Sequence, residues 1–478
     1  MIPGDLSILR AIRRAVDDLT AVTSGEQRAM LGAIDVSLNE LLLRQDRSFY
    51  LDYYRKGFEL VNDGIRLGLG PTSVLADCPP ELGADLANDA VGLHTERVTG
   101  ILETFTAAAQ EIGPAKFKAY LDNITFWEIE LFQHRQRSER SVVGTAPLNF
   151  TKAALISYLQ QRFPDAGPVE VTTFTRIFGG YSKLTIMFST DVELSGGTEF
   201  VIRAEQASII PHAGGSSENE FAVMRYAYEH GIRIPEPLWV ELDAGKMGAR
   251  FVVSRRARGA VFGTTIGASS RLEEGALRDL VRELVKIHSV EVDGANSWVR
   301  KSHLAKWASF PNLRENVLFK FDYWKDIIAR SPHSHSPLIE RCAGWLQQNV
   351  PETDDRPSLV HGDYGLHNIL IEKGAVTAVL DWEVTHFGDR AQDLIYFIIC
   401  LTGAATPEEI LEMYVEEGGM PVSQERLRFY DVYYSYNILI VCNIALARLN
   451  AGAENLLLAE LGLKAMHFYA ERARNVMI

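Results

Sequence analysis

Residues 359–394 read LVHGDYGLHNILIEKGAVTAVLDWEVTHFGDRAQDL and carry the strongest chemical pattern in the chain. Asp363 precedes Asn368 by five positions, and Asp381 follows thirteen positions later. Phosphoryl transfer needs a carboxylate beside the attacking hydroxyl and hard oxygen ligands for Mg²⁺. We therefore interpret Asp363 as a candidate base that accepts the hydroxyl proton, and Asn368 and Asp381 as candidate metal ligands.

A short hairpin is predicted to hold these side chains. Residues 368–372 and 376–381 have the composition of two short strands, so Asp381 is expected at the end of the second. His361 is interpreted as a structural residue that supports the loop through hydrogen bonds. Glu383 follows Asp381 by two positions and is left outside the catalytic set, because a supporting or solvent-facing role explains it equally well.

The loop has the spacing of the protein-kinase catalytic loop H-R-D-x-x-x-x-N, with Gly362 in the place of the arginine. With D-W-E at residues 381–383 and G-D-x-x-x-D at residues 388–393, it resembles the aminoglycoside phosphotransferase and choline kinase-like family of small-molecule kinases. The resemblance covers roughly residues 174–470. It implies a two-lobed kinase-like fold, ATP, Mg²⁺ and a small-molecule hydroxyl as acceptor.

Two acidic residues close to this motif have a simpler interpretation. A helix is predicted to begin near Arg390, and carboxylates at a helix start satisfy its free N–H groups and favour the positive end of its dipole. Asp389 and Asp393 are therefore expected to cap that helix rather than to bind metal.

A glycine turn upstream is a candidate phosphate-binding loop. Residues 176–183, RIFGGYSK, lie between two predicted strands, and Gly179 and Gly180 would let backbone N–H groups approach phosphates. Ser182 would add a hydroxyl contact. Taken alone, the segment is an ordinary hairpin turn, and only the downstream motif favours nucleotide binding.

The resemblance also implies a cation on the third strand and a glutamate on the following helix. Arg203 and Glu220 occupy these positions, so Arg203 is predicted to pair with Glu220 and to contact the nucleotide phosphates. A surface ion pair is the alternative. Many kinases use lysine here, whereas arginine is permanently charged and presents a planar fork. Residues 254–257, rich in arginine, align with the segment whose backbone would hydrogen-bond the adenine base.

The predicted fold class is α+β, with a small antiparallel sheet lobe and a helical lobe after an all-α N-terminal domain. The domain boundaries are 1–140, 150–258 and 259–478, with a linker at 138–149. The predicted sheet-lobe elements are strands at 169–177, 184–189, 199–203 and 249–254 and a helix at 219–230. The N-terminal domain is a candidate cap for the cleft, or a surface for a homodimer or another partner.

Composition narrows the functional class. The 478 residues are 47% hydrophobic and 23% charged, as in globular proteins, and the net charge of −14 disfavours general nucleic-acid binding. The four cysteines form no C-x-x-C pair, so we expect reduced, buried thiols. No apolar stretch is long enough for a membrane span, and no signal-peptide pattern opens the chain, so a cytoplasmic enzyme is expected.

Two other functions remain open from the sequence. A kinase-like enzyme could phosphorylate protein or transfer another part of the nucleotide, but no A-P-E segment follows Asp381. A non-catalytic ligand sensor with a partner-binding N-terminal domain is the second alternative; the intact Asp363, Asn368 and Asp381 weigh against it. Neither the acceptor nor a preference for ATP over GTP follows from any spacing.

Overall fold

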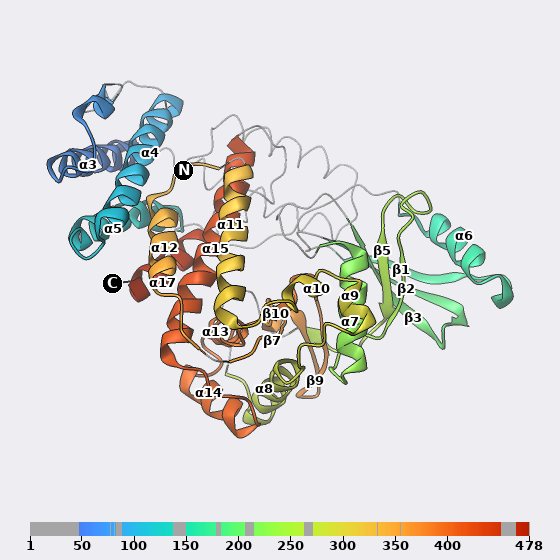
Figure 1. Ribbon diagram of the computed structural model, residues 1–478. Helices are drawn as coiled ribbons and strands as arrows, with labels where there is room; N and C mark the ends of the chain where they lie inside the picture. The colour runs from blue at the N-terminus through green and yellow to red at the C-terminus, as the bar shows by residue number, and fades with distance from the viewer. Residues whose placement is uncertain are drawn as a thin grey trace. The chain divides into compact units, whose positions relative to one another are not determined.

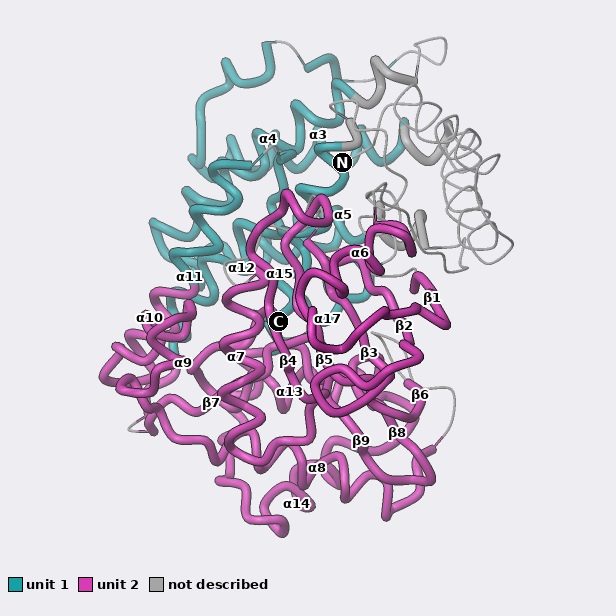
Figure 2. The backbone as a smooth tube through the Cα atoms, turned by 90° about the vertical axis from the view of Figure 1, so that its right-hand side faces the viewer, with its two compact units in different colours: residues 1–144, 321–350, 431–478 teal, residues 145–320, 351–430 magenta. Residues whose placement is uncertain are grey.

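The computed structural model describes residues 47–76, 78–80, 82, 88–136, 150–177, 183–205, 215–261, 271–331, 333–353, 355–450 and 465–477. The chain divides into two compact units, shown in different colours in Figure 2. Unit 1 comprises residues 1–144, 321–350 and 431–478, and unit 2 comprises residues 145–320 and 351–430. Every predicted site residue belongs to unit 2.

Unit 2 contains a five-stranded antiparallel sheet of strand order β1-β2-β3-β5-β4 (Figure 1). Its strands are β1 (Val171–Ile177), β2 (Lys183–Leu194), β3 (Gly197–Glu205), β4 (Pro237–Glu241) and β5 (Phe251–Arg255). The four predicted strands are confirmed with small changes at their ends. β4 was not predicted, because the sequence PLWVE begins with proline and offers only five residues of pattern.

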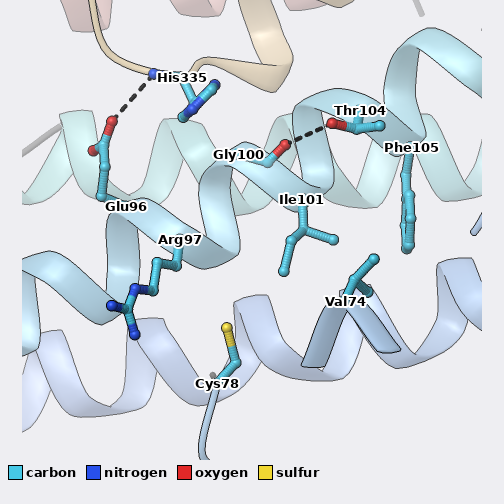
Figure 3. A pocket seen from close by; sticks show the side chains of 9 residues that line it. All are labelled: Val74, Cys78, Glu96, Arg97, Gly100, Ile101, Thr104, Phe105 and His335. Carbon is cyan, nitrogen blue, oxygen red and sulfur yellow. Dashed lines mark hydrogen bonds between the residues drawn. The ribbon is translucent and has the colours of Figure 1, made fainter. Parts of the chain in front are cut away.

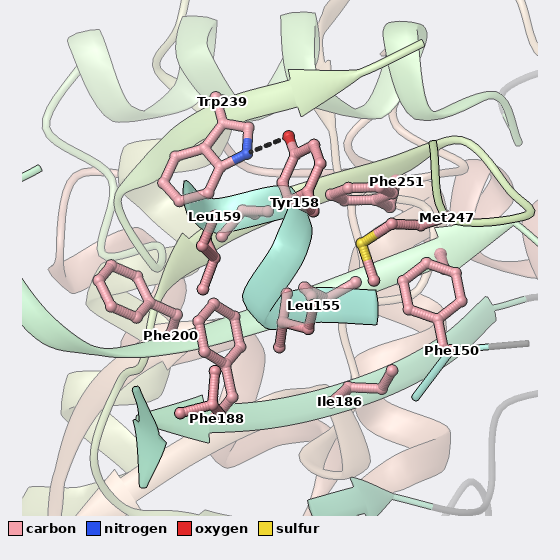
Figure 4. Close-up of a cluster of buried hydrophobic side chains, with 14 of the residues drawn as sticks. Phe150, Leu155, Tyr158, Leu159, Ile186, Phe188, Phe200, Trp239, Met247 and Phe251 are labelled. Carbon is pink, nitrogen blue, oxygen red and sulfur yellow. Dashed lines mark hydrogen bonds between the residues drawn. The ribbon is translucent and has the colours of Figure 1, made fainter. Parts of the chain in front are cut away.

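The core of the sheet lies on the face covered by α6 (Lys152–Arg162). Leu155 and Leu159 of α6 pack with Phe188 and Phe200 of the sheet in one buried cluster (Figure 4). Side chains alternate between the two faces of a strand. Because Phe200, Ile202 and Ala204 belong to this cluster, Arg203 points to the opposite face of β3.

The helix α7 (Ser217–Glu229) packs against β3, β4 and β5. It begins two residues before the predicted start at 219, because Ser216 caps it by accepting a hydrogen bond from the backbone N–H of Asn219 at 3.2 Å. Glu220 lies in its first turn and its side chain is buried. This places a carboxylate beside the strand that carries Arg203.

The rest of unit 2 is mainly helical, with two small sheets. The hairpin of β8 (Ile369–Glu372) and β9 (Ala375–Val379) is joined by β6 (Ala260–Val261), and β7 (Ser358–Val360) pairs with β10 (His386–Gly388). The helices are α8 (Glu274–His288), α9 (Ser297–Arg300), α10 (Leu304–Trp307), α13 (Ala391–Cys400) and α14 (Pro407–Glu416). No helix among the described residues is sufficiently long and apolar to cross a membrane.

Unit 1 is helical where the structure describes it. Its helices are α3 (Arg47–Arg66), α4 (Asn88–Ile112), α5 (Lys118–Gln136), α12 (Pro337–Gln348) and α17 (Met466–Met477), with the later parts of α11 (Leu313–Arg330) and α15 (Gln424–Asn450). The prediction that residues before 140 are helical holds for the part of the chain described. The aromatic residues at 429–436 of α15 are buried.

The observed division differs from the predicted domains, because residues 321–350 and 431–478 group with the N-terminal helices. The helix α12 packs against α4 and α5, and Arg341 of α12 is hydrogen-bonded to Asp122 and, at 2.6 Å, to Thr125. The α17 helix also packs against α5. Amphipathic periodicity predicts which face of a helix is buried but not which helix covers it.

Candidate active site

The loop before β8 brings Asp363 and Asn368 together. The Nδ2 group of Asn368 donates hydrogen bonds to the backbone oxygen of Asp363 at 3.1 Å and to its Oδ2 at 2.7 Å. A single 3₁₀ turn, η3 (Leu366–Asn368), produces this approach, and the backbone N–H of Leu380 donates to the oxygen of Asn368 at 2.7 Å. The predicted base and the predicted amide ligand therefore share one tightly bonded loop.

Asp381 lies just beyond the hairpin rather than within a strand. The sequence predicted a strand over 376–381, but β9 ends at Val379 and Asp381 has a left-handed backbone with φ of 64°. This conformation costs free energy for a residue with a Cβ, so it persists only where the surroundings impose it. The backbone bond from Leu380 to Asn368 keeps Asp381 next to the Asn368 end of the hairpin.

Arg203 joins the sheet to this hairpin. Its Nε lies 2.9 Å from Oε1 of Glu220, and its Nη2 donates to Oδ1 of Asp381 at 2.8 Å. The predicted pairing of Arg203 with Glu220 is thus observed, with the Glu220 side chain only 1% exposed. The contact with Asp381 was not predicted. The planar guanidinium carries N–H groups on several edges, so Arg203 can contact two carboxylates at once.

Lys183 is a buried cation that the sequence analysis missed. Its Nζ lies 3.7 Å from Oε2 of Glu220 and donates to the backbone oxygen of Gly215, and its side chain is only 3% exposed. A lysine directly after a glycine turn is usually solvent-facing. Leu184 and Ile186 of the same strand face the core on the opposite side, so the strand pattern gives no signal that Lys183 is buried.

Carboxylates outnumber cations around Asp381. Burial raises the pKa of Asp381, Arg203 opposes this increase, and the neighbouring carboxylates Glu383, Glu220 and Asp363 reinforce it. Negative charges that repel one another at close range favour the arrival of a cation. This excess of negative charge is compatible with a divalent metal ion.

Asp363 has a cationic neighbour that was also missed. Burial alone would raise the pKa of Asp363, but His367 outweighs that effect, so the pKa lies below its usual value. The Nε2 of His367 lies 3.4 Å from Oδ2 of Asp363. Burial lowers the pKa of His367 and Asp363 raises it, with a net increase to about 10. Asp363 is therefore ionised near neutral pH, as a base must be.

His361 supports the loop, as predicted. Burial lowers the pKa of its ring. The neutral imidazole can donate from Nε2 to the backbone oxygen of Leu380, 2.9 Å away, and accept from the N–H of Asp363 at Nδ1, 3.2 Å away. One ring thus connects the loop that carries the predicted base, Asp363, to the end of the hairpin.

Asp393 is an anchor of this loop rather than a helix cap, which corrects the prediction. Its Oδ2 accepts from the N–H of His361 at 2.7 Å and its Oδ1 from the N–H of Gly362 at 2.8 Å. Gly362 has φ of 87°, and a Cβ there would lie 2.9 Å from the backbone oxygen of Val384, so only glycine fits. The sequence analysis missed this role because Asp393 lies in the first turn of α13, where a carboxylate is expected to cap the helix.

Asp389 does contribute to the start of α13, because its Oδ1 accepts from the N–H of Ala391 at 2.9 Å. It also forms two hydrogen bonds with Arg426, from Nε to Oδ2 at 3.0 Å and from Nη2 to Oδ1 at 2.5 Å. The expected cap is therefore confirmed for Asp389 and is part of a buried ion pair.

Gly179, Gly180 and Ser182 lie outside the described residues, so their predicted phosphate contacts stay predictions. Residues 254–257 are the segment expected to hydrogen-bond the adenine base. There the backbone N–H of Arg255 donates to the backbone oxygen of Glu236 at 2.8 Å, and the backbone N–H of Arg256 donates to the backbone oxygen of Glu199 at 3.1 Å. These two N–H groups are committed to the protein, so an adenine base must use other backbone groups.

Asn368 and Asp381 offer two hard oxygen donors for a metal ion. Asn368 turns its amide nitrogen towards Asp363, which leaves its carbonyl oxygen facing away, and Asp381 gives only Oδ1 to Arg203. Such oxygens suit Mg²⁺, which is commonly held by few protein ligands together with phosphates. Among the described residues no three His, Cys, Asp or Glu side chains gather as a metal site. The residues present therefore fit a metal shared with a nucleotide.

Unit 1 has a separate pocket of about 420 Å³ (Figure 3). It is lined by apolar and charged side chains of the helical region: Val74, Cys78, Glu96, Arg97, Gly100, Ile101, Thr104, Phe105 and His335. None of these residues was predicted to be functional. The pocket is formed within unit 1 and contains no part of the candidate active site.

Sequence comparison finds several curated relatives. The chain is 27% identical over 301 residues to acyl-CoA dehydrogenase family member 11 of Rattus norvegicus, a match that covers 61% of this chain but 37% of the rat protein. It is 25% identical over 221 residues to hygromycin-B 4-O-kinase of Escherichia coli, covering 43% of this chain and 57% of the kinase. The chain therefore spans only part of the length of these curated relatives.

Structural comparison supports the fold. A proposed aminoglycoside phosphotransferase of Ralstonia eutropha is 20% identical, with a TM-score of 0.50 and coverage of 68% of this chain and 98% of that protein. The likeness identifies the kinase-like fold, as predicted. The model of the phosphotransferase enzyme family matches residues 173–430, more than half of the chain. The chain belongs to the phosphotransferase enzyme family.

Proposed function

We propose that this protein transfers the γ-phosphoryl group of ATP, with Mg²⁺, to a hydroxyl of a small molecule. The observation that carries the proposal is the convergence of Asp363, Asn368 and Asp381 at one end of the β8–β9 hairpin, with Arg203 bonded to Asp381 at 2.8 Å. A base, two oxygen ligands and a phosphate-binding cation are the parts that phosphoryl transfer requires. Membership of the phosphotransferase enzyme family supports the same reaction.

Asp363 is the proposed base. The acceptor oxygen attacks the γ-phosphorus, a new O–P bond forms, and the bond from that phosphorus to the β–γ bridging oxygen breaks. The acceptor proton passes to the carboxylate of Asp363, and ADP leaves with the bridging oxygen. Because His367 keeps the pKa of Asp363 low, the carboxylate is ionised and ready to accept the proton near neutral pH.

Asn368 and Asp381 are the proposed ligands of Mg²⁺. When bound, the ion would neutralise charge on the phosphate oxygens. Asn368 is held by its bonds to Asp363, and Asp381 by its backbone and by Arg203. These contacts fix the ligand oxygens before the nucleotide arrives, which reduces the reorganisation needed for the reaction.

Arg203, oriented by Glu220, is the proposed contact to the nucleotide phosphates. Its Nη2 donates a hydrogen bond to Asp381, so phosphate binding would share or replace this bond. The glycine turn with Gly179, Gly180 and Ser182 is the proposed cradle for the same phosphates. The residues would thus surround the triphosphate from the sheet and from the hairpin.

A small-molecule acceptor is favoured by the family and by the similarity to hygromycin-B 4-O-kinase, whose name assigns it a hydroxyl of an antibiotic. At 25% identity this relative supports the class of acceptor and not a particular compound. We propose a hydroxylated small molecule and leave its identity to a screen.

The proposal can be tested by following ATP consumption in a screen of hydroxylated metabolites and antibiotics. The wild type should form a phosphorylated product in the presence of Mg²⁺, and Asp363→Asn should reduce kcat by a factor of about 10²–10⁴ while its affinity for MgATP stays close to wild type. Affinity is measured by the rise of the melting temperature with MgATP concentration.

The matched control is Glu274→Gln, which changes a carboxylate on α8 whose side chain is 79% exposed. It should leave product formation unchanged. MgATP binding without any product in a broad screen would favour the ligand-sensor alternative. Product formation by Asp363→Asn at the wild-type rate would remove Asp363 from its role as the base.

A further inference from the structure

We propose that His367 is a positioning residue that fixes the orientation of the Asp363 carboxylate. The inference rests on the proposed function, because it concerns the base of that reaction. His367 lies on the same loop, four positions after Asp363, and no part of the predicted motif assigns it a role. It is not a catalytic residue in this proposal, since it acts through Asp363.

Two donors converge on one oxygen of the base. The Nδ2 of Asn368 lies 2.7 Å from Oδ2 of Asp363, and the Nε2 of His367 lies 3.4 Å from the same atom. A carboxylate held by one donor can still rotate about χ2, a broad torsion, whereas several donors restrict it.

The His367 ring is itself held in a built site. A Cβ at Gly365 would lie 2.6 Å from Cε1 and 2.8 Å from Nδ1 of His367, so the ring lies directly against the glycine. The same Cβ would lie 2.8 Å from Sγ of Cys400, so the thiol and the ring lie against the same glycine. Tyr396 meets the ring edge-on, with centroids 6.1 Å apart.

This packing fixes the position of the His367 ring. The 3₁₀ turn brings it back towards Asp363, Gly365 leaves room for the ring, and Tyr396 and Cys400 of α13 cover it. The ring is therefore fixed from the side opposite the base, and Nε2 is the atom presented to Asp363. A group that only filled space would not need a polar atom at this position.

The test compares two substitutions of similar size. His367→Gln keeps an N–H donor at about the reach of Nε2, whereas His367→Leu keeps the volume and removes the donor. We expect His367→Leu to lower kcat for phosphoryl transfer between about ten- and a hundredfold, with the KM for MgATP within about twofold of wild type. His367→Gln should recover most of this loss.

Gly365→Ala provides an independent route to the same result, because the added methyl group displaces the ring without removing it. It should behave like His367→Leu in kcat and leave MgATP binding intact. Equal losses in His367→Leu and His367→Gln would mean that only packing matters, and unchanged kcat in His367→Leu would mean that Asp363 needs no second donor. Either result overturns the proposal.

Crystal structures of the wild type and of His367→Leu give a readout that does not depend on turnover. The carboxylate of Asp363 should keep one orientation in the wild type and should rotate or become disordered in the leucine variant. If the wild type neither binds MgATP nor transfers its phosphate, and the Asp363 carboxylate still rotates in His367→Leu, the proposed function fails and the positioning role holds. If the carboxylate stays in place in His367→Leu, the positioning role fails whatever the activity.

Discussion

Arg203 on β3 donates a hydrogen bond to Asp381, a residue 178 positions further along the chain, with 2.8 Å between Nη2 and Oδ1. The same guanidinium lies 2.9 Å from Glu220 on α7. One side chain therefore connects the five-stranded sheet, the helix packed on it and the end of the β8–β9 hairpin. The guanidinium of Arg203 contacts both carboxylates with different nitrogen atoms, which a single ammonium group cannot reproduce.

Arg203→Lys should weaken nucleotide binding although it conserves the charge. Lysine can approach Glu220 or Asp381 but cannot hold both in the observed geometry. We expect the KM for MgATP to rise about tenfold, equivalent to about 1.4 kcal/mol. Steady-state kinetics and thermal shifts with MgATP would measure this effect. A lysine variant with wild-type KM would show that charge alone is sufficient.

Asp381→Asn should raise the Mg²⁺ concentration required for nucleotide binding. Asparagine retains a carbonyl oxygen but loses the negative charge that attracts the cation and pairs with Arg203. The increase in melting temperature produced by ATP should reach its half-maximum at about tenfold higher Mg²⁺ than in the wild type. Glu274→Gln is the control. An unchanged Mg²⁺ requirement would remove Asp381 from the ligand set.

The sequence allowed the catalytic loop to be predicted because its parts are close in the chain. Asp363 and Asn368 are five positions apart, and the hairpin that follows has only a short turn, so local geometry places their side chains together. Arg203 and Glu220 were predicted because the resemblance to the family implies a cation on the third strand and a glutamate on the following helix. The structure brings these two side chains within 2.9 Å.

The roles that were missed depend on long-range packing. No periodic pattern relates Arg203 to Asp381, and Asp393 has the local sequence of a helix start although its carboxylate binds the backbone of the loop. The local sequence of Lys183 is that of a surface residue, but its side chain is buried beside Glu220 of α7. Local preferences specify helices, strands and turns, whereas the partner of a buried charge is decided by how distant elements meet.

Asp393→Asn should destabilise the protein and reduce catalysis together. An amide nitrogen in place of one oxygen would face the N–H of His361 or Gly362, so a buried backbone donor loses its acceptor. We expect a loss of about 2–4 kcal/mol in stability, because the lost bonds are to a buried charged group. Melting temperature and kcat, measured well below the transition, would show both effects.

Asp389→Asn is the matched control for this prediction. Asp389 is also buried and pairs with Arg426, but its side chain holds α13 rather than the loop of Asp363. It should lower the melting temperature while kcat at low temperature stays near that of the wild type. Equal loss of kcat in both variants would contradict a specific connection between Asp393 and the base.

Glu128 of α5 makes the stability of unit 1 depend on pH. Burial raises its pKa to about 7 from 4.5. Its carboxylate oxygens accept from Ser336 at 2.7 Å and from the N–H of Leu338 at 2.6 Å. A carboxyl group whose pKa is higher in the folded protein binds its proton more tightly there, so its contribution to stability is present at acidic pH and is lost as pH rises from about 4.5 to 7.

Glu128→Gln tests this sign directly, because glutamine reproduces the protonated form, with an amide nitrogen that donates to Ser336 and an oxygen that accepts from Leu338. The wild type should lose up to about 3 kcal/mol relative to the variant between pH 4.5 and 7. The comparison cancels other titrating groups of unit 1, including His335, whose pKa is raised by its hydrogen bond to Glu103. Melting temperatures measured across this range should therefore diverge as pH rises. Parallel curves would mean that the pKa of Glu128 is not raised in the folded protein, since only its deprotonation separates the two proteins.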